Sequence, residues 1–125
     1  MITGQVNANL ESVIPLVVQG EGGMELALDV VIDTGYAFYL ALSAATVAAL
    51  RLEQIGVSEL VLADGGVVSS ETCLATVIWD GTPRDIYVDV LETSPLIGVA
   101  LMAGYELTTR FIAGETVTLT ACELS

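Results

Sequence analysis

Short apolar runs separated by glycine-rich turns are the main pattern along this chain. Residues 13–18 form a β-branched apolar run, residues 20–23 contain three glycines, and residues 24–32 resume the apolar run. Two apolar runs joined by such a turn predict a β-hairpin. A second hairpin is predicted for residues 59–62 and 67–70, because the Asp-Gly pair in the connection tolerates the positive φ angles of a tight turn.

The rest of the chain follows the same pattern, with two interruptions that have helical spacing. Ser43 is a good N-cap for a helix over residues 44–52 that closes near Gly56, and residues 96–105 predict a second short helix with Gly104 near its end. Further strands are expected at residues 73–79, 86–91, 107–112 and 116–121, the last two as a hairpin that turns at Ala113-Gly114. Many short strands with two brief helices predict an all-β, barrel-like fold with a largely antiparallel sheet, in one domain spanning residues 1–125.

Composition narrows the choice of partners. The chain has 125 residues, 54% of them hydrophobic, but no apolar run approaches the ~18 residues of a membrane helix. The formal net charge of −13 opposes binding to nucleic acid or to an anionic membrane, because both require clustered Lys and Arg. Such a charge favours cationic peptides, although solubility alone also explains it. No secretory signal is visible at the N-terminus, so a cytoplasmic location is the expectation.

The chain contains no histidine and no lysine, and this excludes many mechanisms. A Ser-His-Asp or Cys-His site, a histidine zinc site, a phosphate-loop lysine and a Schiff base are all ruled out within one chain. Cys73 and Cys122 lie in apolar contexts, and we expect both to be free, buried thiols. No metal or cofactor is expected, and carboxylates remain for acid-base chemistry.

Three aspartates that could be considered as calcium ligands have an ordinary explanation. Asp80, Asp85 and Asp89 match no calcium-loop spacing, and they alternate with apolar residues, so a solvated strand face is predicted for them. Arg84 and Arg110 are expected to pair with nearby acids at the surface.

One carboxylate has a different setting. Asp33-Thr34-Gly35 directly follows the apolar residues 30–32, which places Asp33 at the end of a buried strand. Alone, such a triplet is also an ordinary turn after a strand. Here it is followed by a glycine hairpin and then by Pro95-Leu96-Ile97-Gly98, in that order.

This order of motifs resembles the retropepsin-like aspartic proteases, the single-domain relatives of pepsin, and in particular their short bacterial members. The resemblance covers most of the chain and implies a closed retropepsin-like acid protease barrel. It also implies a homodimeric endopeptidase, in which Asp33 of each subunit contributes to a pair of carboxylates about 3 Å apart that share one proton and activate a water. Thr34 and Gly35 complete the implied catalytic loop, and Ile97 and Gly98 support it from beneath.

The resemblance also assigns residues to a protein or peptide substrate. The second hairpin corresponds to the family's flap, which closes over an extended peptide. The implied substrate-binding residues are Tyr36, Ala63, Asp64, Gly65 and Gly66. The family commonly has Ala or Ser where this chain has Tyr36, and Asp64 puts a charge at the tip. A catalytically silent peptide-binding or dimerisation module on the same fold is therefore the alternative function.

Overall fold

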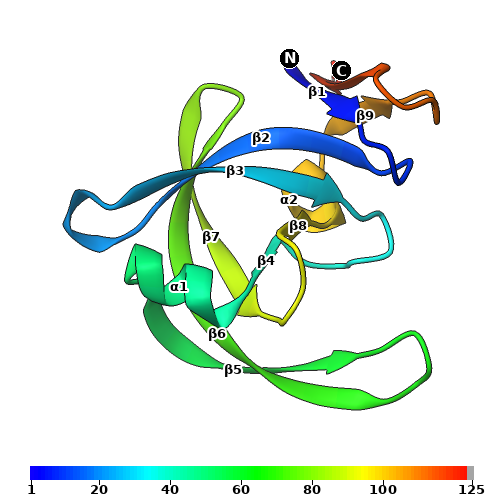
Figure 1. The fold of residues 1–125 in the computed structure, drawn as a ribbon. Helices are drawn as coiled ribbons and strands as arrows, with labels where there is room; N and C mark the ends of the chain where they lie inside the picture. Colours follow the sequence, from blue (N-terminus) through cyan, green and yellow to red (C-terminus); the bar gives the residue numbers. More distant parts are fainter. Residues whose placement is uncertain (124–125) are drawn as a thin grey trace.

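The computed structural model describes residues 1–123, so the last two residues of the predicted domain lie outside the described part. In that part, ten strands join one sheet, accompanied by two short α-helices and one 3₁₀ turn at Glu21–Gly23 (Figure 1). The elements follow one another as β1 (Ile2–Val6), β2 (Ser12–Gln19), β3 (Glu25–Ile32), β4 (Leu40–Leu42), α1 (Ala44–Leu50), β5 (Glu53–Val61), β6 (Val67–Trp79), β7 (Thr82–Val90), β8 (Leu96–Ile97), α2 (Val99–Met102), β9 (Tyr105–Thr108) and β10 (Thr116–Ala121).

Six of the strands close into a barrel. They are hydrogen-bonded in the order β6-β7-β4-β8-β3-β2, and β2 pairs with β6 to close the ring, with Val18 opposite Val77. Most pairings are antiparallel, whereas β3–β8 and β4–β7 are parallel. The all-β class with a closed barrel and two short helices is therefore confirmed.

Alternating burial along β2 and β6 fills this barrel. In β2, Ile14, Leu16 and Val18 are buried, and in β6 the buried positions from Cys73 to Trp79 also alternate. Fully burying an aliphatic side chain stabilises a fold by about 1.5–3 kcal/mol. A shift of one residue in either strand would turn these side chains to the other face, so the alternation fixes the register.

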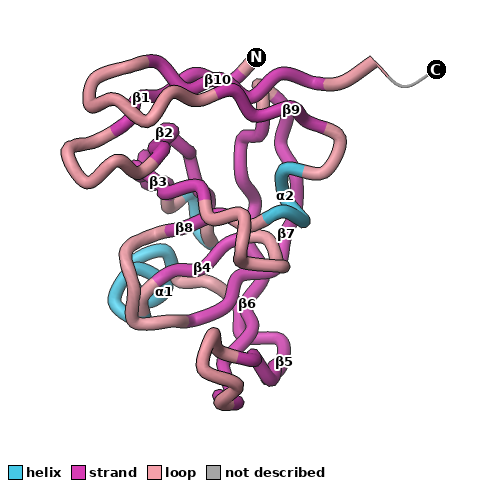
Figure 2. The backbone as a smooth tube through the Cα atoms, turned by 90° about the vertical axis from the view of Figure 1, so that its right-hand side faces the viewer, coloured by secondary structure: helices cyan, strands magenta, loops and turns pink. Residues whose placement is uncertain are grey.

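The chain ends form a smaller extension of the same sheet. β1 pairs with β2 and with β10, and β10 pairs with β9, which places both terminal regions at one end of the molecule (Figure 2). β9 and β5 are the two edges of the sheet. Neither helix in the described residues is long and apolar enough to cross a membrane.

The first helix begins as predicted but ends earlier. Ser43 caps it, because its Oγ accepts a hydrogen bond from the Thr46 amide at 3.3 Å. The predicted closure near Gly56 is wrong. Arg51 adopts a left-handed conformation with φ 53°, which ends the helix after Leu50, and the chain continues into β5.

The second predicted helix is mostly not helical. Leu96 and Ile97 form β8 between β3 and β4, and only Val99–Met102 is helical before Gly104, at φ 85°, turns the chain into β9. The last hairpin also differs from the prediction, since β9 stops at Thr108. The following loop is bonded elsewhere: the Gly114 amide donates to the Val6 carbonyl, and the Val6 amide donates to the Glu115 carbonyl, both at 2.9 Å.

Two predictions about single residues also require correction. Both cysteines are free, but only Cys73 is buried; Cys122 follows the end of β10 and is exposed. Arg84 does not pair with an acid. Its guanidinium donates to the Leu101 carbonyl at 3.1 Å and lies over the Tyr39 ring, and no arginine forms a salt bridge within residues 1–123.

Candidate active site

Asp33 is fixed where β3 ends. Its backbone amide donates to the Ile97 carbonyl at 3.0 Å, and its carboxylate oxygen Oδ1 accepts from the Gly35 amide at 2.9 Å. In the described part of the chain no donor reaches the other oxygen, Oδ2. The turn therefore orients the carboxylate and leaves one oxygen available for chemistry.

β8 and the residues beside it hold this turn from the side. The Val31 amide donates to the Pro95 carbonyl at 2.9 Å, and Ile97 pairs with Ile32 on one side and with Leu40 on the other. The Gly98 amide then donates to the Tyr39 carbonyl at 3.1 Å. The structure thus places Ile97 and Gly98 against the Asp33 loop, which is where the resemblance puts its supporting residues.

A cavity of about 460 Å³ opens beside Asp33 and Thr34. Leu10 and Phe111, from two loops near the chain ends, line it and are 50% and 68% exposed. Ser12 and Thr109 join those loops through a hydroxyl–hydroxyl bond of 2.9 Å. Asp33 therefore lies on a surface flanked by exposed apolar side chains.

Tyr36 lies away from this cavity. It is half-buried, and its hydroxyl donates to the Asp89 carboxylate and, at 3.4 Å, to the Leu40 carbonyl. Burial, and then the hydrogen bond and negative charge of Asp89, raise the pKa of Tyr36 well above its ordinary value of 10.0. Tyr36 does not line the cavity next to Asp33, so the side chains of Tyr36 and Asp33 lie in different environments.

Asp89 corrects another prediction. A solvated position was expected, but the side chain is only 5% exposed. It lines a separate apolar pocket between the loop that follows Asp33 and the strand β5, so these segments cover it. Alternation along β7 carries no signal of this burial, because the covering segments come from other parts of the chain.

The Tyr36 bond predicts a specific dependence of stability on pH. Below pH 10 the Tyr36 phenol is protonated in both the folded and the unfolded chain, and its contribution to the free energy of unfolding is fully present. Above pH 10 the unfolded chain releases the proton while the folded chain retains it, so the free energy of unfolding should fall as pH rises. Urea unfolding between about pH 8 and about pH 11 will measure this fall.

Two variants isolate the effect. Tyr36→Phe should be less stable than the wild type at pH 8, because Asp89 loses its donor, and should lose less stability above pH 10. Tyr87→Phe, which changes an exposed tyrosine on β7, should follow the wild type. Parallel curves for wild type and Tyr36→Phe would contradict the assigned bond.

The predicted flap residues form the turn between β5 and β6. The Leu62 amide donates to the Gly66 carbonyl at 2.7 Å, and the Gly66 amide donates to Asp64 Oδ1 at 2.8 Å. The charge of Asp64 thus stabilises its own turn. None of the described residues around the Asp33 cavity belongs to β5 or β6, so within one chain the tip and the Asp33 loop are not brought together.

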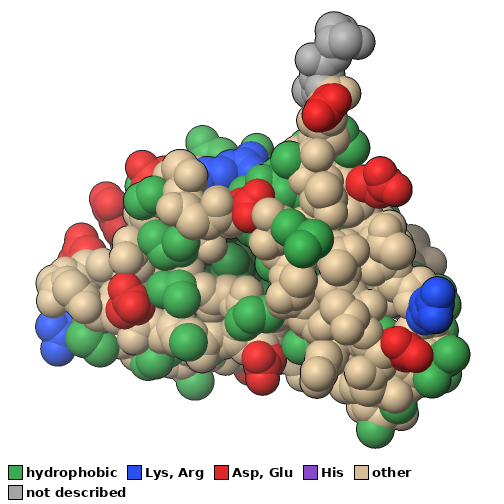
Figure 3. Space-filling model, turned by 90° about the horizontal axis from the view of Figure 1, so that it is seen from above, with side chains coloured by type: hydrophobic (Ala, Val, Ile, Leu, Met, Phe, Trp, Pro, Cys, Tyr) green, Lys and Arg blue, Asp and Glu red, His purple; other side chains and the backbone are tan. Residues whose placement is uncertain are grey.

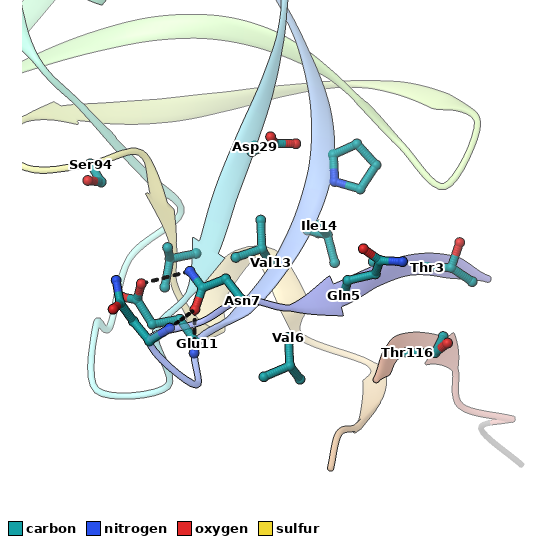
Figure 4. Close-up of a pocket in the computed structure, with 14 residues that line it drawn as sticks. Thr3, Gln5, Val6, Asn7, Glu11, Val13, Ile14, Asp29, Ser94 and Thr116 are labelled. Carbon is teal, nitrogen blue, oxygen red and sulfur yellow. Dashed lines mark hydrogen bonds between the residues drawn. The ribbon is translucent and has the colours of Figure 1, made fainter. Parts of the chain in front are cut away.

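A larger cavity of about 860 Å³ lies on the outer face of β1, β2 and β3 (Figure 4). Asn7 and Glu11 at its rim bond to each other, with Nδ2 donating to Oε1 at 2.9 Å. Its other carboxylate, Asp29, is exposed on the strand surface. No group of three or more potential metal ligands occurs in residues 1–123. Glu11, which also lines the Asp33 cavity, is held by a side chain, whereas Asp33 is held by a backbone amide.

Comparison with known proteins supports the fold but not the chemistry. No protein-family model matches the chain, and neither does any curated protein. Among solved structures, EIAV protease complexed with the inhibitor HBY-793 is similar, with a TM-score of 0.51 and 18% sequence identity. The match covers 74% of this chain and 85% of that protein. At this identity the likeness concerns architecture, and in architecture the chain is a retropepsin-like barrel.

Proposed function

We propose that the protein is an aspartic endopeptidase, active as a homodimer, in which two Asp33 carboxylates activate a water. The observation that carries this proposal is the setting of Asp33. Its loop is fixed by the Gly35 amide and the Ile97 carbonyl, one carboxylate oxygen has no donor within residues 1–123, and Asp33 lines an open cavity in a retropepsin-like barrel. Without histidine or lysine, the chain has carboxylates as its available general acids and bases.

The chemistry requires a second carboxylate. Two carboxylates about 3 Å apart share one proton, because like charges that close cannot both ionise. The ionised member takes a proton from the attacking water, and the protonated member donates to the carbonyl oxygen of the scissile bond. One chain supplies one Asp33, so the second comes from another copy related by a two-fold axis.

This requirement defines the dimer surface. If the two Asp33 side chains meet, the surface around each of them is buried between the copies. That surface carries Leu10 and Phe111, and its apolar burial would offset the repulsion between two chains of net charge −13. β9, a free edge strand, ends at the same cavity through Leu107.

The dimer surface predicts the effect of a single substitution. Phe111→Glu should shift the protein to monomer, because it places a charge at the centre of an apolar contact. Met24→Glu is the matched control, since Met24 is also an exposed apolar residue, 37% accessible, but lies in the β2–β3 hairpin far along the barrel (Figure 1). Sedimentation velocity will distinguish the two, and equal dimer fractions in both variants would contradict this surface.

The function itself is tested by peptide cleavage. A mixture of diverse peptides, incubated with the protein from about pH 4.5 to about pH 7 and analysed by mass spectrometry, should show defined cuts, since a shared-proton pair titrates below neutrality. If a folded, dimeric protein produces no cuts, the result would favour the alternative function, a catalytically silent peptide-binding or dimerisation module.

A further inference from the structure

The apolar pocket at Asp89, of about 300 Å³, lies between the Asp33 loop and the stem of the β5–β6 hairpin. Phe38 and Tyr39, which follow Asp33 in the same loop, form one wall, and Ile55 and Val57 of β5 form another. Ligand pockets of whole small molecules begin at about this volume, so the pocket suits one side chain of a longer ligand. A peptide that lay between the catalytic loop and the hairpin would pass over it.

The floor of this pocket contains Asp89. The side chain is 95% buried by area, and one oxygen, Oδ2, accepts the Tyr36 hydroxyl. Within residues 1–123 no donor reaches Oδ1. Asp89 lines the pocket with this oxygen unused, and a buried carboxylate with an unused oxygen is costly unless a cation or further donors approach it.

No cation of the described chain fills this position. Arg84, on the same strand, donates to the Leu101 carbonyl and forms no salt bridge in the described part of the chain. One wall suits a cation nevertheless, because the exposed Tyr87 lines the pocket with its aromatic ring, whereas the Tyr39 ring already lies under the Arg84 guanidinium. The overall charge of −13 adds a long-range attraction, and acidic side chains are spread among apolar ones over the face seen in Figure 3.

We propose that this pocket binds an arginine or lysine side chain of the peptide substrate, with Asp89 Oδ1 as its counter-charge. Arginine fits best, since its planar guanidinium donates to a carboxylate and stacks on aromatic rings at the same time. The substrate class is then an extended peptide with a basic residue near the cleaved bond. The identity of the occupant as a substrate rests on the proposed protease function.

A binding experiment separates this inference from catalysis. The probes are the fluorescein-labelled peptide Ala-Val-Val-Arg-Val-Val-Ala and its twin with citrulline, which has the shape of arginine without the charge. Binding is measured by anisotropy with the Asp33→Asn protein, so that no cleavage occurs. Amide shifts of Ser58 and Thr72, which line the pocket, locate the binding site by NMR.

The arginine peptide should bind at least about 30-fold more tightly than the citrulline peptide, as expected when a buried charge finds its partner. Asp89→Asn should remove this difference, and asparagine can still accept the Tyr36 bond. Asp85→Asn, which removes an exposed carboxylate from the same strand, should retain it. If Asp89→Asn does not fold, Gly56→Leu supplies the test: Gly56 lines the pocket and a Cβ there meets nothing within 4 Å, so the larger side chain should fill the pocket and remove the preference for the arginine peptide.

Equal binding of both peptides, or an equal loss in Asp89→Asn and Asp85→Asn, would overturn the proposal. So would shifts confined to residues outside the pocket. Selective arginine binding, together with a wild-type protein that cleaves no peptide, would instead overturn the protease function and leave the pocket assignment in place.

Discussion

Asp33→Asn will abolish peptide hydrolysis. In a symmetric dimer the substitution removes both members of the carboxylate pair, and with them the general base and the general acid. We expect cleavage rates to fall by about 10⁴-fold, the upper range for such catalysis. The loop should keep its shape, because asparagine Oδ1 accepts the Gly35 amide as Asp33 Oδ1 does. Initial rates on any peptide that the wild type cuts will measure the loss.

A matched variant excludes a general effect of charge. Asp29→Asn removes an exposed carboxylate from β3, the strand that precedes Asp33, and its activity should equal that of the wild type. Mixed dimers provide a second test, because a dimer with one Asp33→Asn subunit retains one carboxylate and should also be inactive. Full activity in mixed dimers would show that each subunit works alone, and retained activity in Asp33→Asn would exclude the mechanism.

Local patterns in the sequence were sufficient for the first two hairpins and for the all-β class. The apolar run at residues 13–18 and the run at residues 73–79 predict strands, and the structure has them in β2 and β6, with Ile14, Val18 and Val77 buried. The Ser43 cap is equally local, since its bond to Thr46 spans one turn. Such features depend only on residues that are close together in the sequence.

Features created by distant segments were not predictable in this way. Leu96 and Ile97 have an apolar spacing that fits a helix, but pairing with β3 and β4 makes them a strand. Asp89 alternates with apolar residues as a solvated residue does, but β5 and the Asp33 loop cover it. In both cases contacts with distant segments override the local pattern. Leu96 lines the Asp33 cavity, and Asp89 lines the pocket beside the loop that follows Asp33.

Gly98→Ala should cause a large loss of stability, because a methyl group has no space there. A Cβ atom at this position would lie 2.3 Å from the Phe38 carbonyl oxygen and 2.4 Å from that of Tyr36. Both are backbone atoms, so no side-chain rotation relieves the clash. Gly98 has φ −111°, which any residue tolerates, so the restriction is one of space. We expect the free energy of unfolding to fall by about 3 kcal/mol or more.

Backbone hydrogen bonds next to Gly98 explain why Gly98→Ala should also displace the Asp33 loop. The Val99 amide donates to the Tyr36 carbonyl at 3.0 Å and the Ala100 amide donates to that of Phe38 at 3.2 Å, so displacing residue 98 pulls on the loop that begins at Asp33. Gly56→Ala is the control, because a Cβ there meets nothing within 4 Å, and its effect should stay within about 0.5 kcal/mol. Urea unfolding measures both variants. A loss below about 1 kcal/mol in Gly98→Ala would mean that the loop can move aside, and that Gly98 does not fix the position of Asp33.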